Sequence, residues 1–132
     1  MVGCQVIVLD THAWIWWTSA PTKLGRKAQY RIRKEGRIGI PAIACWEFSM
    51  LVERGRITLD RPPLEWVEQA LAQPKAELIP LTPAIAVTST QLGAFHGDPA
   101  DRMIVATAVV HGTKLISQDK KIADCPLVET VW

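Results

Sequence analysis

The sequence predicts an α/β fold in one domain, with a central parallel sheet of about four or five strands and helices on both faces. The chain has 132 residues, of which 48% are hydrophobic, enough for one compact core. Short aliphatic runs alternate along the chain with longer helical patterns, and no repeat or long linker separates them. Alternating strands and helices favour a parallel sheet covered on both sides.

The predicted strands are short and end in Pro, Leu or Asp. The first, "QVIVLD", is the kind of aliphatic run that fills a strand buried on both faces. The four strands are Gln5–Asp10, Gly36–Pro41, Ala76–Leu81 and Thr113–Asp119. The six predicted helices are Thr11–Ser19, Thr22–Lys34, Ala42–Arg54, Pro62–Ala72, Pro83–Leu92 and Pro99–His111. Parallel sheets bind ligands at the carboxyl ends of their strands, and Asp10 lies at such an end.

The composition favours a cytoplasmic protein that does not enter a membrane. The three cysteines, Cys4, Cys45 and Cys125, form no CxxC pair, which argues against a disulfide framework and a structural zinc site. No apolar run approaches the roughly 18 residues that a membrane-spanning helix needs.

The basic residues are unevenly placed, although the net charge is only +2. Seven of them fall within fifteen positions, opposed only by Glu35. Such a run is typical of a surface that binds a polyanion such as RNA, and equally of a solvated helix face. Its members are Lys23, Arg26, Lys27, Arg31, Arg33, Lys34 and Arg37.

Two aspartates are expected at strand ends, where ligands of parallel sheets bind. Asp10 closes the first strand, and Asp119 closes the strand that carries Ser117 on the same face. Taken singly, Asp10 is explained better as the N-cap of the next helix, and Asp119 equally well as an ordinary turn aspartate.

Two further carboxylates are predicted on inward faces of helices. The neighbours of Glu47 at helical spacing are apolar, so its carboxylate needs a cation or donors, and an arginine partner is the alternative. In "HGDPADRMIVATA", Asp98 reads as an N-cap and Asp101 as the third helical residue. Asp101 also shares a face with apolar residues, which turns it inward.

Together these four acids predict a site for hard cations. Several carboxylates in one pocket raise one another's pKa unless cations are present. Oxygen ligands without clustered Cys or His favour Mg²⁺ or Mn²⁺, as one ion or two. The chemistry indicated is metal-assisted phosphodiester hydrolysis. The four residues are Asp10, Glu47, Asp101 and Asp119.

Four segments in order, "VIVLDTHAWIWW", "IPAIACWEFSMLVERGRITLD", "HGDPADRMIVATA" and "LISQD", resemble PIN-domain ribonucleases, specifically the VapC-like toxins of prokaryotic type II toxin–antitoxin systems. The resemblance spans Val6 to Asp119 and implies a single PIN-like domain. It also implies metal-dependent RNA cleavage, a homodimer, and a cognate antitoxin that can place a basic side chain in the acidic pocket.

The same resemblance implies roles for particular residues. The family's acidic metal ligands match Asp10, Glu47, Asp101 and Asp119. The family also has a polar residue after the first aspartate, here Thr11, and often a serine or threonine near the metal, here Ser117. His96, Asp98 and Arg102 fit an "HxDPxDR" signature. His96 is expected either to contact phosphate or orient Asp101, or to be an ordinary hydrogen-bonded residue. Arg102 is expected to hold a neighbouring acid or a dimer partner.

Six tryptophans are a high count for this length. Trp14, Trp16 and Trp17 fall within one helical turn and cannot all face one core. We expect at least one in a groove, where it anchors an antitoxin helix or a second subunit; the alternative is ordinary packing with one residue partly exposed.

Two other functions fit parts of the pattern. The basic run suits a nucleic-acid-binding module that no longer cleaves its ligand. Strand-end aspartates also suit a metal-dependent phosphohydrolase acting on small phosphate esters. The intact set of acids favours the nuclease over the binding module, and the absence of a "DxD" strand end at Asp10 disfavours the phosphohydrolase.

Overall fold

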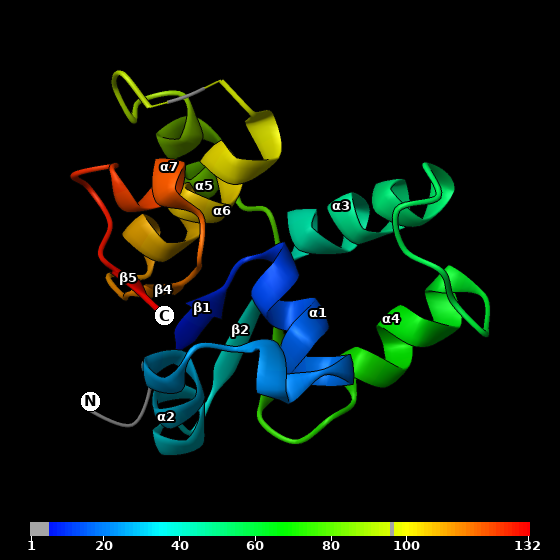
Figure 1. Ribbon diagram of the computed structural model, residues 1–132. Helices are drawn as coiled ribbons and strands as arrows, with labels where there is room; N and C mark the ends of the chain where they lie inside the picture. The colour runs from blue at the N-terminus through cyan, green and yellow to red at the C-terminus, as the bar shows by residue number, and fades with distance from the viewer. Residues whose placement is uncertain (1–5, 96) are drawn as a thin grey trace.

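The computed structural model describes residues 6–95 and 97–132. Its five strands are all parallel and run in the order β3-β2-β1-β4-β5 across one sheet, within the range predicted. The strands are β1 (Ile7–Leu9), β2 (Ile38–Pro41), β3 (Ala76–Ile79), β4 (Leu115–Ile116) and β5 (Thr130–Val131). Helices cover both faces of this sheet (Figure 1), which confirms the predicted fold class.

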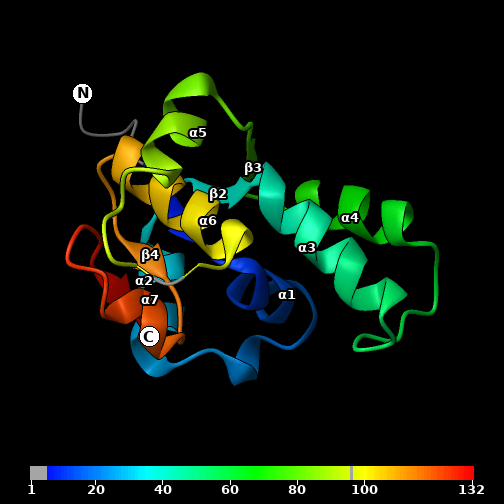
Figure 2. The same cartoon turned by 90° about the horizontal axis from the view of Figure 1, so that it is seen from above.

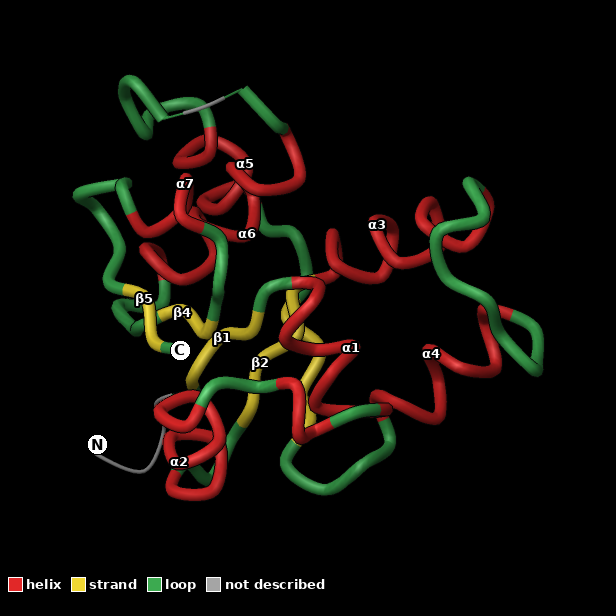
Figure 3. Tube along the Cα trace, in the orientation of Figure 1, coloured by secondary structure: helices red, strands yellow, loops and turns green. Residues whose placement is uncertain are grey.

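One or more helices lie between each strand and the next along the chain (Figure 3). They are α1 (Thr11–Ser19), α2 (Arg26–Lys34), α3 (Ala42–Glu53), α4 (Pro63–Leu71), α5 (Pro83–Ser89), α6 (Pro99–Val110) and α7 (Lys120–Ala123). A 3₁₀ turn, η2, occupies Pro21–Lys23. The helix predicted from Thr22 therefore begins only at Arg26, because Leu24 and Gly25 are extended. Neither α7 nor β5 was predicted.

Alternating side chains of β1 serve two separate cores, as expected for a strand buried on both faces. Ile7 and Leu9 face a core formed with α1, α2, α3 and α4. Val6 and Val8 face a second core formed largely by α5 and α6. Figure 2 shows α5 and α6 lying together, and α3 and α4 lying side by side at the right of the view.

The first core contains an aromatic cluster that we call the aromatic core: Trp14, Phe48 and Trp66. The Phe48 and Trp66 rings stack with centroids 4.2 Å apart, and Trp14 meets both rings edge-on at 5.8 and 5.4 Å. Trp14 and Phe48 are fully buried. This cluster fixes α1, α3 and α4 against one another.

Two further predictions from the sequence concern membrane insertion and disulfide bonds. In the described part of the chain, no helix is both long and apolar enough to cross a membrane. Cys45 and Cys125 are free thiols, and Cys4 lies outside the described residues.

Candidate metal centre

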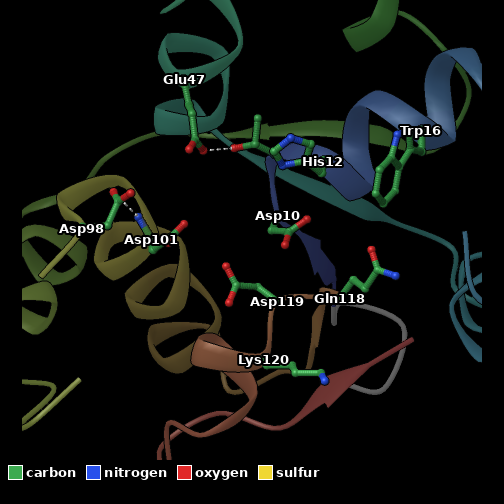
Figure 4. A pocket seen from close by; sticks show the side chains of 10 residues that line it. Asp10, His12, Trp16, Glu47, Asp98, Asp101, Gln118, Asp119 and Lys120 are labelled. Carbon is green, nitrogen blue, oxygen red and sulfur yellow. Dashed lines mark hydrogen bonds between the residues drawn. The ribbon is translucent and has the colours of Figure 1, made fainter. Parts of the chain in front are cut away.

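A cavity of about 680 Å³ opens beyond the carboxyl ends of β1 and β4. All four acids predicted as metal ligands line it, from four different segments of the chain (Figure 4). We call it the acidic cavity. Its lining residues are Asp10, Thr11, His12, Trp16, Glu47, Asp98, Asp101, Gln118, Asp119 and Lys120.

Asp10 is fixed at the floor of the acidic cavity by the strand it follows. Its N–H donates to the Ile116 carbonyl at 3.1 Å, and its carboxylate accepts from the Ala13 N–H at 2.9 Å. The predicted N-cap is thus present. Burial raises the pKa of Asp10, as does the Glu47 charge, while hydrogen bonds from Ser117 and Ala13 and the nearby His12 act in the opposite direction.

Glu47 reaches the acidic cavity from the side, out of α3. Its carboxylate accepts a hydrogen bond from the Thr11 hydroxyl, and Thr11 is itself buried. Glu47 is half-buried, so it faces the cavity rather than the apolar core. The partner identified is thus a hydroxyl rather than the arginine that the sequence left open, and this hydroxyl orients the carboxylate.

Asp98 and Asp101 begin α6. The Asp98 carboxylate accepts from the N–H groups of Ala100 and Asp101 at 2.9 and 3.3 Å, which confirms the predicted cap. One carboxylate oxygen from each of Asp98, Asp101 and Glu47 lies within 4.8 Å of the others. Asp98 therefore belongs to the acidic group as well as capping the helix, a role that sequence reasoning missed.

Asp101 is the group most affected by its neighbours. Burial, followed by the charges of Asp98, Glu47, Asp119 and Asp10, raises its pKa to about 7. Near neutral pH this carboxyl is therefore on the edge of ionisation when no cation is present. A divalent cation is the natural counter-charge for such a cluster.

Asp119 approaches from the opposite side, where it caps α7. Its carboxylate accepts from the N–H groups of Lys121 and Ile122 at 2.8 and 3.3 Å. The Ser117 hydroxyl accepts from the Asp119 N–H at 3.1 Å and also hydrogen-bonds the Asp10 side chain. Ser117 thus links the two strand-end aspartates, as its predicted position suggested.

The donors of the acidic cavity fit Mg²⁺ or Mn²⁺. Among the described residues that line the cavity, five are carboxylates, none is Cys, and the single histidine is His12, whose ring centroid lies 5.7 Å from that of Trp16. Oxygen-rich sites of this kind select hard divalent ions. Glu47 and Asp101 are only half-buried, which leaves an opening toward a substrate.

Two further residues were predicted for the site, His96 and Arg102. His96 lies outside the described residues. Arg102 donates to the carbonyls of Ser89 and Phe95 at 2.9 and 2.8 Å, so it ties the end of α5 and the following loop to α6. This backbone-anchoring role was not among the two that the sequence suggested.

The basic run does not reach the acidic cavity, because none of its seven members lines it. Arg31 pairs with Glu35 at 2.8 Å and Arg37 with Glu77 at 2.6 Å. The other five are exposed. Three of them, Arg26, Lys27 and Arg33, border a separate hollow on α2.

The three tryptophans of α1 lie in different surroundings, as their spacing requires. Trp14 is in the aromatic core, and Trp17 is partly buried against that core. Trp16 lines the acidic cavity, and its role as an anchor for an antitoxin helix or a second subunit stays a prediction. Gln118 and Lys120 also line it and were not predicted, because α7, which begins at Lys120, was not recognised.

The fold and the carboxylate cluster define a class of protein, and comparison with known proteins identifies it. The family model for the PIN domain matches residues 7–126. The chain is 36% identical over 129 residues to Ribonuclease VapC22 of Mycobacterium tuberculosis, covering 96% of this chain and 98% of that protein. The chain therefore belongs to the PIN-domain family, in its VapC branch.

Solved structures agree on the fold. DNA-bound VapBC from Salmonella typhimurium matches with a TM-score of 0.72 at 17% identity, covering 96% of each chain. VapBC2 from Rickettsia felis, bound to a promoter DNA fragment, matches with a TM-score of 0.70 at 14% identity, covering 96% of this chain and 97% of that one. The architecture is thus that of VapC chains.

Proposed function

We propose that this protein is a metal-dependent endoribonuclease that hydrolyses RNA phosphodiester bonds and serves as the toxin of a toxin–antitoxin pair. The observation that carries the proposal is the convergence of the carboxylates of Asp10, Glu47, Asp101 and Asp119 in one open cavity. Membership of the VapC branch and 36% identity to a protein named as a ribonuclease support RNA as the substrate.

Asp10, Glu47, Asp101 and Asp119 would hold Mg²⁺ or Mn²⁺, as one ion or two. When bound, the ion lowers the pKa of a water that attacks phosphorus and stabilises charge on the phosphate oxygens. Thr11 holds the Glu47 carboxylate in place, and Ser117 holds Asp10. Asp101 would hold the cation as an ionised carboxylate, because its raised pKa comes from burial and like charges that a cation would offset.

The exposed members of the basic run, on and just before α2, are proposed to bind the RNA backbone away from the cleavage site. Five lysines and arginines of this run are exposed, and such clusters attract phosphates over a distance of about 10 Å. Substituting them is therefore expected to weaken RNA binding and to make that binding less sensitive to salt. Cleavage at saturating RNA concentrations should remain.

The proposed partners are RNA, a cognate antitoxin and a second copy of the chain. The structural neighbours include VapBC complexes and a toxin–antitoxin complex from Klebsiella pneumoniae, which supports an antitoxin partner. A homodimer is expected from the family resemblance alone. Co-expression with a neighbouring antitoxin, followed by light scattering of the complex, measures both assemblies.

The function is tested by incubating a pool of structured RNAs with the purified protein in Mg²⁺ or Mn²⁺, against EDTA. An identically purified Asp101→Asn variant excludes a contaminating nuclease. We expect metal-dependent cleavage that disappears in the variant. Equal behaviour of both proteins would overturn the proposal.

The same experiment separates the two alternatives. Tight RNA binding without metal-dependent cleavage of any substrate would favour a binding module. Turnover of a generic phosphomonoester with RNA left intact would favour a small-ester phosphohydrolase.

A further inference from the structure

The acidic cavity has a second side that carries no carboxylate. Trp16 and His12 come from α1, and Gln118 and Lys120 come from the segment joining β4 to α7. Figure 4 shows Trp16, Gln118 and Lys120 across the cavity from Glu47, Asp98 and Asp101, with Asp10 and Asp119 between them. We call these four non-acidic residues the aromatic wall.

The indole of Trp16 is held in place by aromatic neighbours. Its ring centroid lies 5.7 Å from that of His12 and 5.6 Å from that of Trp132. Trp132 is fixed in turn against Gly25, where an added Cβ would lie 2.5 Å from the Trp132 backbone. A ring immobilised before binding loses little conformational entropy when a ligand stacks on it.

The chemistry of the aromatic wall matches a nucleotide. A half-buried indole offers a surface on which any base can stack. Gln118 and Lys120 are exposed: the amide can donate to and accept from the edge of a base, and the ammonium can contact a phosphate. The cavity volume of about 680 Å³ is typical of sites for small molecules.

We propose that the aromatic wall binds the base of a nucleotide that adjoins the scissile phosphate, and so sets which RNA bond is cut. Trp16 stacks on the base, Gln118 hydrogen-bonds its edge, and Lys120 contacts the neighbouring phosphate. This inference rests on the proposed RNA hydrolysis and adds to it the determinant of substrate choice. The carboxylates hold the cation, and the opposite wall positions the nucleotide.

The test compares an intact RNA oligonucleotide with one that lacks the base beside the mapped cleavage bond, first on one side and then on the other. We expect the missing base at one of these positions to lower kcat/KM of the wild type by about tenfold to a hundredfold. Trp16→Leu lowers kcat/KM on intact RNA by a similar factor, mainly through KM. Removing the base then has little further effect, because the stacking partner is already gone.

Two variants serve as controls. Trp16→Phe keeps a stacking ring and is expected to retain most of the dependence on the base. Trp46→Leu removes another tryptophan, 55% exposed on α3 and outside the cavity, and is expected to match the wild type on both RNAs. If Trp16→Leu fails to fold, Gln118→Ala takes its place and is expected to reduce discrimination among the four bases at that position.

The outcomes distinguish this inference from the proposed function. Equal dependence on the base in wild type and Trp16→Leu would overturn the role of Trp16, because a purely structural loss lowers cleavage of both RNAs alike. Wild-type cleavage that ignores both neighbouring bases would overturn the inference and leave the nuclease standing. If no RNA is cut in Mg²⁺ or Mn²⁺, the proposed function fails and this inference fails with it.

Discussion

The aromatic core and the acidic cavity share two helices, α1 and α3, and have opposite physical character. On α3, Phe48 is fully buried in the core, while its neighbour Glu47 lines the cavity. On α1, Trp14 enters the core and Thr11 supports the cavity. Burying aromatic surface favours folding, whereas crowding carboxylates opposes it. The comparison indicates that one region stabilises the molecule and the other holds its reactive groups, so the two should be separable by substitution.

Asp101→Asn is expected to separate the loss of activity from the loss of stability most clearly. Loss of this proposed metal ligand should lower RNA cleavage by about a thousandfold or more. The free energy of unfolding of the metal-free protein above pH 7 should stay equal or rise, because one like charge leaves the cluster. Cleavage assays and urea unfolding measure the two effects.

The matched control is Asp124→Asn, an exposed carboxylate at the end of α7 that lies outside the acidic cavity. This substitution should change neither the rate of RNA cleavage nor the free energy of unfolding appreciably. Parallel loss of stability and activity in Asp101→Asn would show that the two regions are not separable.

The converse substitution is Phe48→Ala in the aromatic core. Removing this buried ring should lower the free energy of unfolding by about 3–5 kcal/mol. Trp46→Ala, two residues earlier and 55% exposed, should lower it by less than about 1 kcal/mol. Similar values for the two variants in urea unfolding would contradict the assignment of stability to the core.

A smaller effect is expected where the two regions meet, at Thr11. Thr11→Val removes the hydroxyl that donates to Glu47 while keeping the shape of the side chain. Cleavage should fall about tenfold to a hundredfold, as for other residues that orient metal ligands. Thr11→Ser retains the donor and should retain most of the activity; equal losses in both variants would argue that packing matters rather than the hydroxyl.

A last comparison concerns the pH dependence of metal-free stability. The pKa of Asp101 is raised from 3.8 to about 7 in the folded protein. As pH rises between these values, the unfolded chain releases this proton while the folded chain keeps it, so folding stability falls. Thermal unfolding in EDTA from pH 4 to 8 should reveal this slope, and Asp101→Asn should reduce it. An unchanged slope in the variant would assign the effect to other groups.

Elements with local signals were predictable from the sequence. The predicted bounds of α1, Thr11–Ser19, are those observed, because Asp10 supplies a readable N-cap. The four-residue helix α7 and the two-residue strand β5 are too short to show a period. Their formation depends on pairing and packing that a local pattern does not encode.

The site residues were predictable where a strand end or an inward helix face determines the position of the side chain. Asp10, Glu47, Asp101 and Asp119 all line the cavity that their spacing suggested. Asp98 was assigned to helix capping and to the "HxDPxDR" signature but not to the metal ligands, because a cap explains its position fully without reference to α3. The aromatic wall was not predicted because the setting of Trp16 depends on Trp132, 116 positions further along the chain.

The most direct test of the central claim, that the acidic cavity holds a divalent cation, is anomalous X-ray diffraction from crystals grown with Mn²⁺. We expect an anomalous peak inside the cavity, in contact with the Glu47 and Asp101 carboxylates, and its loss in crystals of Asp101→Asn. A wild-type cavity without a peak at saturating Mn²⁺ would contradict the account.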